Sequence, residues 1–374
     1  MSEAFELQMG KTPSRDNSEY WNGDETWVSI SDMGNSKYIA NSKEGITQKA
    51  IEESGIKKVP QGCVIMSFKL SVGKVAIAEC PLYTNEAIMS FKPKDEFDLI
   101  PEYTYYYLKG YKWDGINRAA MGQTLNKATI SQGMFSYPPL AEQKRIVSEL
   151  DLLSSIIDKQ KAQLKELDTL AQSIFYDMFG NPVENEKGWI VKPLGELCDI
   201  FRGASPRPIE HFLGGTIPWI KIGDATKGDD IYLHATKEHI IEEGLKKTRY
   251  IHSGSLIFAN CGVSLGFARI ITFDGCIHDG WLAFDNISDE VDKIFLLKSL
   301  NYCTPYFRSI APDGTQPNLN TAIMKVFKQI IPPLEMQKTF IKKIQMIEKQ
   351  KIAISKSFVE SQKLLDYMMD KYFG

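Results

Sequence analysis

Two long stretches of the chain repeat one pattern of apolar and polar positions. Residues 138–180 and residues 332–374 align without a gap at an offset of 194 residues. Apolar residues recur in both at spacings of three and four, which places them on one narrow stripe of a helix. In the first stretch the stripe positions are Ile146, Leu150, Leu153, Ile157, Gln160, Leu164, Leu167, Ala171, Ile174 and Met178. In the second they are Phe340, Ile344, Ile347, Lys351, Ile354, Phe358, Ser361, Leu365, Met368 and Tyr372.

A stripe sustained over about five heptads is typical of a coiled coil. Paired prolines before each stripe suit a helix start, since the first turn of a helix needs no proline N–H. Gly180, followed by Asn181-Pro182, is a matching stop signal. Because one narrow stripe needs a partner, we expect the two helices to pack together. Two surface helices on a single large domain are the less favoured alternative.

The segments before the two helices also repeat, more loosely. Trp27 and Trp219 each begin a short alternating run, and both are expected in the core. Gly62 and Gly254 each precede an apolar run that predicts a strand, because it is short, glycine-bounded and rich in β-branched and aromatic residues. The Tyr105-Tyr106-Tyr107 run predicts a packed helix. The sequence therefore predicts two globular domains, 1–137 and 181–331, each followed by a helical segment, 138–180 and 332–374.

Composition narrows the class of protein. A chain of 374 residues with 43% apolar content can bury more than one core. No signal peptide and no bilayer-length apolar run occurs, so a cytoplasmic protein is expected. Six cysteines without C-x-x-C spacing are expected to be reduced, and His234 with His239 lacks a third metal ligand nearby. We therefore predict neither metal nor cofactor.

Catalytic motifs are missing from the sequence. The segment Val72-Gly73-Lys74-Val75 fails the phosphate-loop pattern at both ends. Asn181-Pro182 lacks the second proline and the aromatic residue of an adenine methyltransferase motif, and it fits a helix end better. We therefore expect a protein that is not an enzyme.

Several motifs occur twice in the same order. Each helix is preceded by Leu-Asn and then by Pro-Pro-Leu-x-x-Gln, and each ends in Phe-Gly. These motifs are Leu125-Asn126 with 138–143, Leu319-Asn320 with 332–337, and the Phe-Gly pairs at 179–180 and 373–374. Gly188-Trp189 and the run 193–197 (Pro-Leu-Gly-Glu-Leu) lead into the second domain. The constellation covers nearly the whole chain and resembles the specificity (S) subunits of type I restriction-modification systems.

This resemblance implies an α+β fold: two mixed α/β recognition domains separated by two long helices that form an antiparallel coiled coil, with a pseudo-two-fold internal repeat. It implies that each domain reads half of a bipartite site in double-stranded DNA. It also implies that the helices set the spacing and dock two methyltransferase (M) subunits, with restriction (R) subunits joining through the complex. Methylation and cleavage belong to those partners.

One departure from the family pattern concerns the first domain. It starts at Met1 without the Gly-Trp and Pro-Leu-Gly-Glu-Leu lead-in that precedes Gly203. We expect its edge to be clipped, or to be completed by the C-terminal segment.

Both predicted globular domains carry more acidic than basic residues, which disfavours DNA binding by charge alone. Residues 1–137 hold 15 Lys and Arg against 17 Asp and Glu, and residues 181–331 hold 16 against 18. DNA-binding domains usually carry a basic excess because phosphate contacts supply much of the affinity. Binding must therefore come from local clusters or from charge that the M subunits supply.

Candidate base-reading residues are Arg, Lys, Asn, Gln, Ser and His side chains in or beside glycine-punctuated segments, because such side chains match the donors and acceptors of base edges. In the first domain they are Lys11, Arg15, Ser29, Ser31, Lys69, Lys74, Arg118 and Gln123. In the second they are Arg207, Lys221, Lys227, Asn260, Ser264, His278, Arg308 and Gln316.

Two other functions are less favoured by the sequence. A coiled-coil tether with protein-binding domains is disfavoured, because the two domains share a repeated set of residues while the residues between them differ. A single-chain modification enzyme is disfavoured by the missing motifs.

Overall fold

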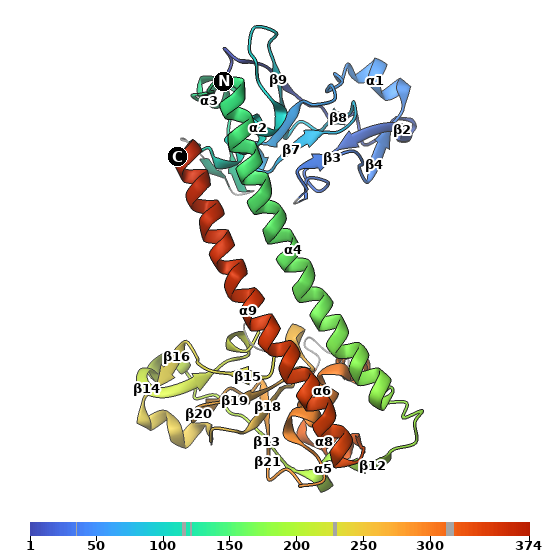
Figure 1. The fold of residues 1–374 in the computed structure, drawn as a ribbon, viewed down its shortest axis with the longest axis vertical. Helices are drawn as coiled ribbons and strands as arrows, with labels where there is room; N and C mark the ends of the chain where they lie inside the picture. The colour runs from blue at the N-terminus through green and yellow to red at the C-terminus, as the bar shows by residue number, and fades with distance from the viewer. Residues whose placement is uncertain (35, 114–116, 120–121, 227–229, 312–317) are drawn as a thin grey trace. The chain divides into compact units, whose positions relative to one another are not determined.

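The computed structural model describes residues 1–34, 36–113, 117–119, 122–226, 230–311 and 318–374. Their contacts divide the chain into two compact units. Unit 1 comprises Met1–Lys159 and Phe358–Gly374, and unit 2 comprises Gln160–Ser357. The long helices α4 (Leu140–Phe179) and α9 (Leu334–Phe373) each contribute one part to unit 1 and the other part to unit 2 (Figure 1).

Unit 1 is built on a five-stranded sheet in the order β1-β9-β5-β7-β3, in which only the β3–β7 pair is parallel. Strands β5 and β7 are buried along their whole length, and helix α2 packs against both. A second sheet has the order β4-β2-β8, with β2 and β8 parallel. The elements are β1 (Phe5–Met9), β2 (Trp21–Val28), β3 (Tyr38–Ile39), β4 (Glu44–Ile46), α1 (Gln48–Ser54), β5 (Val64–Ser67), β6 (Lys69–Leu70), β7 (Val75–Ala78), β8 (Tyr83–Thr84), β9 (Ile88–Pro93), α2 (Pro101–Gly110), β10 (Asn117–Ala119), β11 (Gly122–Thr124) and α3 (Lys127–Gln132).

Unit 2 repeats this topology. Its main sheet has the order β13-β21-β18-β19-β15, with the β15–β19 pair parallel, and its second sheet has the order β16-β14-β20-β17, with β14 and β20 parallel. The elements are β12 (Ile190–Pro193), α5 (Leu194–Leu197), β13 (Asp199–Arg202), β14 (Leu213–Ile220), β15 (Tyr232–Leu233), β16 (Glu238–Ile240), β17 (Arg249–Ile251), β18 (Leu256–Ala259), β19 (Ala268–Ile271), β20 (Gly275–Ile277), β21 (Trp281–Asp285), α6 (Lys293–Tyr302), α7 (Thr304–Ile310), α8 (Thr321–Val326) and β22 (Lys328–Ile331). The predicted strands after Gly62 and Gly254 are β5 and β18, the central strands of the two main sheets.

The helix stripe predicted from the sequence is confirmed. Every stripe position of α4 and α9 is buried or half-buried, whereas off-stripe apolar residues such as Leu152 and Met346 are 63% and 66% exposed. In unit 2 the two helices run antiparallel, because Gln160 lies opposite Ser357 and Asp168 lies opposite Lys351. In unit 1 the early part of α4 meets the end of α9, where the Tyr372 hydroxyl donates to Glu149.

The aromatic anchors lie where the sequence predicted them. Trp27 and Trp219 are 1% and 0% exposed, and the three tyrosines 105–107 are buried on α2. The fold is α+β with two mixed domains, two long helices and an internal repeat, as the sequence predicted. Within the described residues no helix is long and apolar enough to cross a membrane. The same residues hold no group of three or more His, Cys, Asp or Glu side chains able to bind a metal ion. The six cysteines carry free thiols.

Candidate functional site

Four turns of unit 2 meet at one edge of its sheets. We call residues 203–208, 221–226, 260–266 and 278–280 the turn edge of unit 2. They meet because β13, β14 and β18 end here and β21 begins here. Main-chain hydrogen bonds join them: Gly203 N–H donates to Trp281 O (2.9 Å). Asn260 N–H donates to Gly280 O (3.0 Å), and His278 N–H donates to Ile220 O (3.1 Å).

Unit 1 has the same arrangement. Its turn edge comprises residues 10–15, 29–32, 68–74 and 85–87. Gly10 N–H donates to Ile88 O (3.1 Å), Phe68 N–H to Ala87 O (2.9 Å) and Asn85 N–H to Val28 O (3.0 Å). The two Leu-Asn motifs attach to this frame alike, because Leu125 N–H donates to Phe68 O and Leu319 N–H donates to Asn260 O, each at 2.8 Å. Both units therefore present different side chains from one main-chain frame.

Glycine is required at one position of this frame. A Cβ atom at Gly203 would lie 2.2 Å from His278 O, and a Cβ atom at Gly10 would lie 2.2 Å from Asn85 O. Neither distance is compatible with a side chain unless the backbone moves. The glycine that both repeats carry at this position thus lets two turns approach each other closely.

A carboxylate stands at the centre of each turn edge. In unit 2 Asp279 accepts hydrogen bonds from the Ser205 hydroxyl (2.9 Å) and the Arg207 guanidinium (3.2 Å). His278 Nε2 lies 3.0 Å from the same carboxylate. In unit 1 the Thr12 hydroxyl donates to Glu86 in the corresponding place. A hydroxyl paired with a carboxylate is therefore common to both units, while the surrounding cations are not.

The electrostatics of the unit 2 edge keep His278 neutral and Asp279 ionised. Burial lowers the pKa of His278, and the charges of Lys221, Arg207 and Arg202 lower it further against the opposing effect of Asp279. Burial would raise the pKa of Asp279, but the hydrogen bonds from Ser205 and Arg207 and the positive charge of Arg207 outweigh it, so that this pKa is lowered. The edge therefore offers acceptors and donors side by side at neutral pH.

Several candidate base-reading residues of the first domain lie on the turn edge of unit 1. The Ser29 hydroxyl contacts Ser31 (2.8 Å) and Asp32 (2.7 Å), and Lys74 Nζ donates to Ile30 O at 3.2 Å. Lys11 follows Gly10 and is exposed. Arg15 is already engaged: its guanidinium makes two bonds to Glu44 and lies 3.8 Å from the centre of the Trp21 ring.

A small sheet adds three more predicted positions. Strand β6, which carries Lys69, pairs with β11, and β11 pairs with β10. The backbones of Arg118 and Gln123 lie directly opposite each other in the β10–β11 pair. The structure thus brings the backbones of Lys69, Arg118 and Gln123 together beside the turn edge.

In the second domain, Arg207, Lys221, Ser264 and His278 lie on the turn edge. The Arg207 side chain is 79% exposed, whereas Lys221 Nζ lies 2.6 Å from Glu238. Arg308, on α7, donates from Nε to Leu265 O (3.3 Å) beside it. Lys227 and Gln316 lie outside the described residues.

Asn260, a candidate base-reading residue from the sequence, is not exposed in the structure. Its side chain is fully buried, and its amide nitrogen donates to Asn318 Oδ1 at 3.2 Å. Asn260 directly follows the fully buried strand β18, so its side chain lies in the same buried surroundings. The Asn260 side chain therefore joins this turn to the segment that carries Asn318.

The sequence analysis did not identify Thr12 and Glu86 on the turn edge of unit 1, Asp279 on that of unit 2, or Arg202 at the adjoining end of β13. The carboxylates could have been found by aligning the repeats, since each follows Asn85 or His278 in the same turn. Arg202 donates from Nε to Asp279 O (3.1 Å), a contact between residues 77 positions apart that no local pattern indicates.

A cavity of about 410 Å³, lined by Tyr250, His252 and Lys293 among others, lies at the end of β18 and β21 opposite the turn edge of unit 2.

Comparison with known proteins identifies relatives for the whole chain. A family model described as the type I restriction modification DNA specificity domain matches residues 1–169 and again residues 186–360. The MjaIX type I restriction enzyme specificity subunit of Methanocaldococcus jannaschii is 27% identical over an alignment of 392 positions, which covers 98% of this chain and 90% of the relative. The HindI specificity subunit of Haemophilus influenzae is 28% identical over 178 residues, 45% of this chain and 38% of the relative.

Solved structures share the fold. The S subunit of a type I restriction-modification system from M. genitalium superposes with a TM-score of 0.57 at 15% identity, covering 100% of this chain and 94% of that one. A chain solved in a study of complex assembly and conformational transition in the type I R-M system gives a TM-score of 0.64 at 19% identity, covering 100% and 96%.

Proposed function

The chain belongs to the type I restriction-modification DNA specificity family, and we propose on this premise that it selects the DNA site of a type I complex. Its recognition domains, residues 1–137 and 181–331, each read one half of a bipartite duplex target. The helices set the spacing of the halves and dock two M subunits, while R subunits join through the complex. The chain itself performs no chemical step and works in the cytoplasm.

One observation carries this proposal. The two turn edges share their main-chain hydrogen bonds and their central hydroxyl–carboxylate pair, yet they present different cations and polar groups. Two surfaces of one architecture and different chemistry suit a target whose two halves have different sequences.

The chemistry of the turn edges fits base edges in the major groove. Arg and Lys donate to guanine N7 and O6, carboxylates accept from cytosine N4, and serine serves either role. Arg207 in unit 2 and Lys74 in unit 1 are exposed cations on these edges. We propose them as the leading direct contacts, with Ser29, Ser264, Asp279 and Glu86 as further ones.

We propose that the M subunits supply the attraction for DNA that the two recognition domains lack. Each recognition domain carries two more acidic than basic residues, so long-range attraction for DNA is weak. We propose that M subunits contribute the phosphate contacts that fix the duplex, while this chain chooses the sequence. Exposed apolar residues on the helices suit such docking, and they include Leu152, Leu170, Met346, Ile352 and Tyr367.

The proposal is tested by finding the target and then damaging one half of its recognition. Sequencing of methylated adenines in cells that express the chain with its M subunit identifies the target. Affinity of the purified complex is then measured on duplexes with one half-site scrambled. Arg207→Ala should reduce discrimination at the second half-site by about tenfold or more and leave the first unchanged. Lys74→Ala should do the reverse.

Each matched control removes a lysine that lies outside the turn edges. Lys328→Ala on β22 and Lys92→Ala on β9 should leave discrimination at both halves unchanged. Absence of a methylated bipartite site, or equal effects of the edge variants and the controls, would contradict the proposal. This chain without M should bind DNA weakly and with little preference.

The spacing role has its own test. Seven residues inserted after Leu164 and seven after Phe358 keep the heptad pattern and lengthen each helix by about 10 Å. The tolerated gap between half-sites should then grow by about three base pairs. A folded, active variant that keeps the original gap would remove the spacing role from the proposal.

A further inference from the structure

The exposed face of α9 in unit 2 carries a row of lysines. Lys342, Lys349 and Lys356 follow one another at intervals of seven residues, and all three are exposed. Seven residues make nearly two helical turns, so the side chains stand in one line with about 10 Å between neighbours. Counted in heptads, this line lies on the side of α9 opposite the stripe that contains Ile347 and Lys351. We call these three residues the lysine row.

No acidic residue of α9 shares the exposed face with the row. Over residues 336–357 the only acid is Glu348, whose side chain is 9% exposed and lies 2.8 Å from Lys298 on α6. Lys338, earlier on the helix, shows the usual alternative, because it pairs with Glu335 at 2.8 Å. Among the described residues the lysine row forms no ion pair and no hydrogen bond. Its positive charge is therefore neutralised by no neighbouring side chain.

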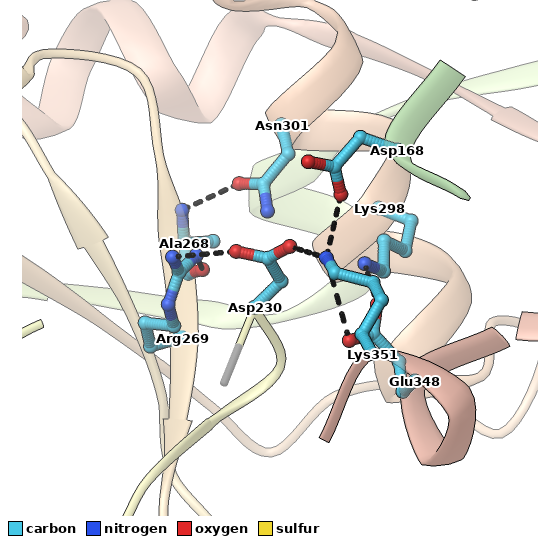
Figure 2. Close-up of polar contacts among 8 residues, drawn as sticks. All are labelled: Asp168, Asp230, Ala268, Arg269, Lys298, Asn301, Glu348 and Lys351. Atoms are coloured by element: carbon cyan, nitrogen blue, oxygen red, sulfur yellow. Dashed lines mark hydrogen bonds and ion pairs between the residues drawn. The ribbon is translucent and has the colours of Figure 1, made fainter. Parts of the chain in front are cut away.

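The charges on the inner side of α9 do have partners. Lys351 lies 2.6 Å from Asp168 on α4 and also contacts Asp230, in the segment before β15 (Figure 2). Glu348 is held by Lys298 in the same view. Unit 2 thus pairs the charges that face its own elements, and the lysine row is left for a molecule outside this chain.

The row is specific to one of the two repeated helices. The positions 194 residues earlier, on α4, hold Ser148, Ser155 and Ala162, which are exposed as well. Residues 142–163 of α4 include four acidic and four basic residues, whereas residues 336–357 of α9 include one acidic and six basic residues. Both helices carry the apolar stripe, so the stripe does not require the lysines.

Exposed apolar side chains alternate with the lysines. Met346 lies between Lys342 and Lys349 on the helix surface, because residues three and four positions apart are neighbours. Ile352 lies between Lys349 and Lys356 in the same way. The two apolar residues are 66% and 56% exposed. An apolar side chain gains nothing from a phosphate backbone, whereas protein interfaces combine apolar residues with charged ones. The face therefore suits a protein surface that offers carboxylates and apolar groups, rather than duplex DNA.

We infer that the lysine row docks an acidic surface of the M subunit, whose apolar groups cover Met346 and Ile352. The inference rests on the proposed function, in which M subunits dock on the helices, and it adds the chemistry of that contact. Charged side chains around an interface steer the partner and speed association. Salt weakens this attraction, because it screens exposed charges beyond about 10 Å at 0.1 M. Docking on this face of α9 is thus sensitive to ionic strength.

Neutralising the row tests the inference. Lys349→Gln with Lys356→Gln removes two charges and keeps residues that favour a helix. At about 50 mM NaCl we expect the variant to bind purified M at least about fivefold more weakly than the wild-type chain does, and at about 500 mM NaCl less than about twofold. Lys349→Arg with Lys356→Arg keeps the charges and should bind M like the wild type. Isothermal titration calorimetry at both salt concentrations gives the affinities.

The matched control removes two exposed lysines elsewhere. Lys43→Gln with Lys328→Gln changes the net charge by the same amount and should leave M binding unchanged. Thermal unfolding of the free chain should be alike for all variants, because the row makes no ion pair or hydrogen bond with other described residues. Weaker M binding at an unchanged unfolding temperature then reports the contact with M and not damage to the fold.

Other occupants of the face give different results. If the glutamine variant binds M normally but the resulting complex loses affinity for duplexes of every sequence, the row contacts DNA phosphates and the inference is wrong. If neither M binding nor DNA binding changes, the row is only a solvated surface, and the inference is wrong as well. Wild-type binding to M with the same salt dependence as the variant overturns the inference alone. A wild-type chain that binds M at neither salt concentration overturns the docking role in the proposed function, and the inference with it.

Discussion

Gln143 and Gln337 make the same three hydrogen bonds in the two units. Gln143 accepts from Ile100 N–H (3.2 Å) and donates to Asp98 O (2.8 Å) and Pro138 O (2.9 Å). Gln337 accepts from Asp292 N–H (2.8 Å) and donates to Glu290 O (3.0 Å) and Pro332 O (2.8 Å). Both side chains are fully buried. The glutamine of the repeated Pro-Pro-Leu-x-x-Gln motif is therefore the clamp between each long helix and the segment entering α2 or α6.

Removing this clamp should loosen one unit at a time. Gln337→Ala leaves one donor and two acceptors unpaired, and we expect a loss of about 2–4 kcal/mol in the free energy of unfolding of unit 2. Chemical denaturation measures the loss, and hydrogen exchange should rise near residues 290–292 but not near 98–100. Gln345→Ala, on the exposed face of the same helix, should change little. Equal effects of both variants would contradict the clamp.

The close approach at the turn edge predicts a large effect of a single methyl group. Gly203→Ala places a Cβ against the His278 carbonyl, so the turns must separate, at a cost of about 1–3 kcal/mol. Selectivity at the second half-site should fall with it. Gly223→Ala is the matched control, since a Cβ at Gly223 meets no atom within 4 Å. Thermal unfolding of the two variants side by side gives the comparison, and an undisturbed Gly203→Ala would refute it.

His278 should make unit 2 sensitive to mild acid. Burial lowers the pKa of His278 in the folded state, so the unfolded chain takes up the proton first as the pH falls. Stability contributed by the neutral imidazole is therefore present above about pH 6.5 and is lost as the pH drops below it. Because the side chain is 37% exposed, we expect a change below about 1 kcal/mol.

Substitution isolates the contribution of this histidine. His278→Asn introduces the residue that stands at the corresponding position of unit 1, Asn85, and should flatten the stability profile between pH 5 and 7. His252→Asn, at a side chain that is 79% exposed, should retain the slope. Unfolding free energies across this range decide the matter, and an unchanged slope in the His278 variant would count against it.

Two adjacent residues of α9 allow the apolar stripe and the exposed face of the helix to be tested separately. Ile347 is 5% exposed and Met346 is 66% exposed. Ile347→Asp buries an unpaired carboxylate and should cost at least about 3 kcal/mol, abolishing binding to every DNA sequence alike. Met346→Asp should leave the fold intact and weaken only the association with the M subunit. Circular dichroism and analytical gel filtration with M distinguish the two outcomes.

Much of the architecture is predictable because its signals are local or periodic. The stripes of α4 and α9, the proline starts and the glycine stop all act within one helical turn. The strands β5 and β18 are short apolar runs between glycines, and they proved to be the centres of the two sheets.

Individual site residues were less predictable, because their environments depend on distant segments. Asn260 follows an apolar run and resembles a surface polar residue in sequence, yet Asn318 and the end of β18 enclose it. Lys351 reads as an imperfection in an apolar stripe, and its partner Asp230 lies 121 residues away. Arg15 is a plausible ligand contact by type, but Glu44 and Trp21 already hold it. Pairing across the fold, rather than residue type, decides which polar groups remain available.

The main-chain frame of the turn edges has an evolutionary consequence. Its bonds use peptide N–H and carbonyl groups, which every residue except proline supplies in full. Replacement of Ser29, Lys74, Arg207 or Ser264 changes what the surface presents without removing a bond of the frame. Fold stability and ligand preference are therefore largely uncoupled at these positions. A lineage can drift to a new preference through single substitutions, each viable, without passing through an unfolded ancestor.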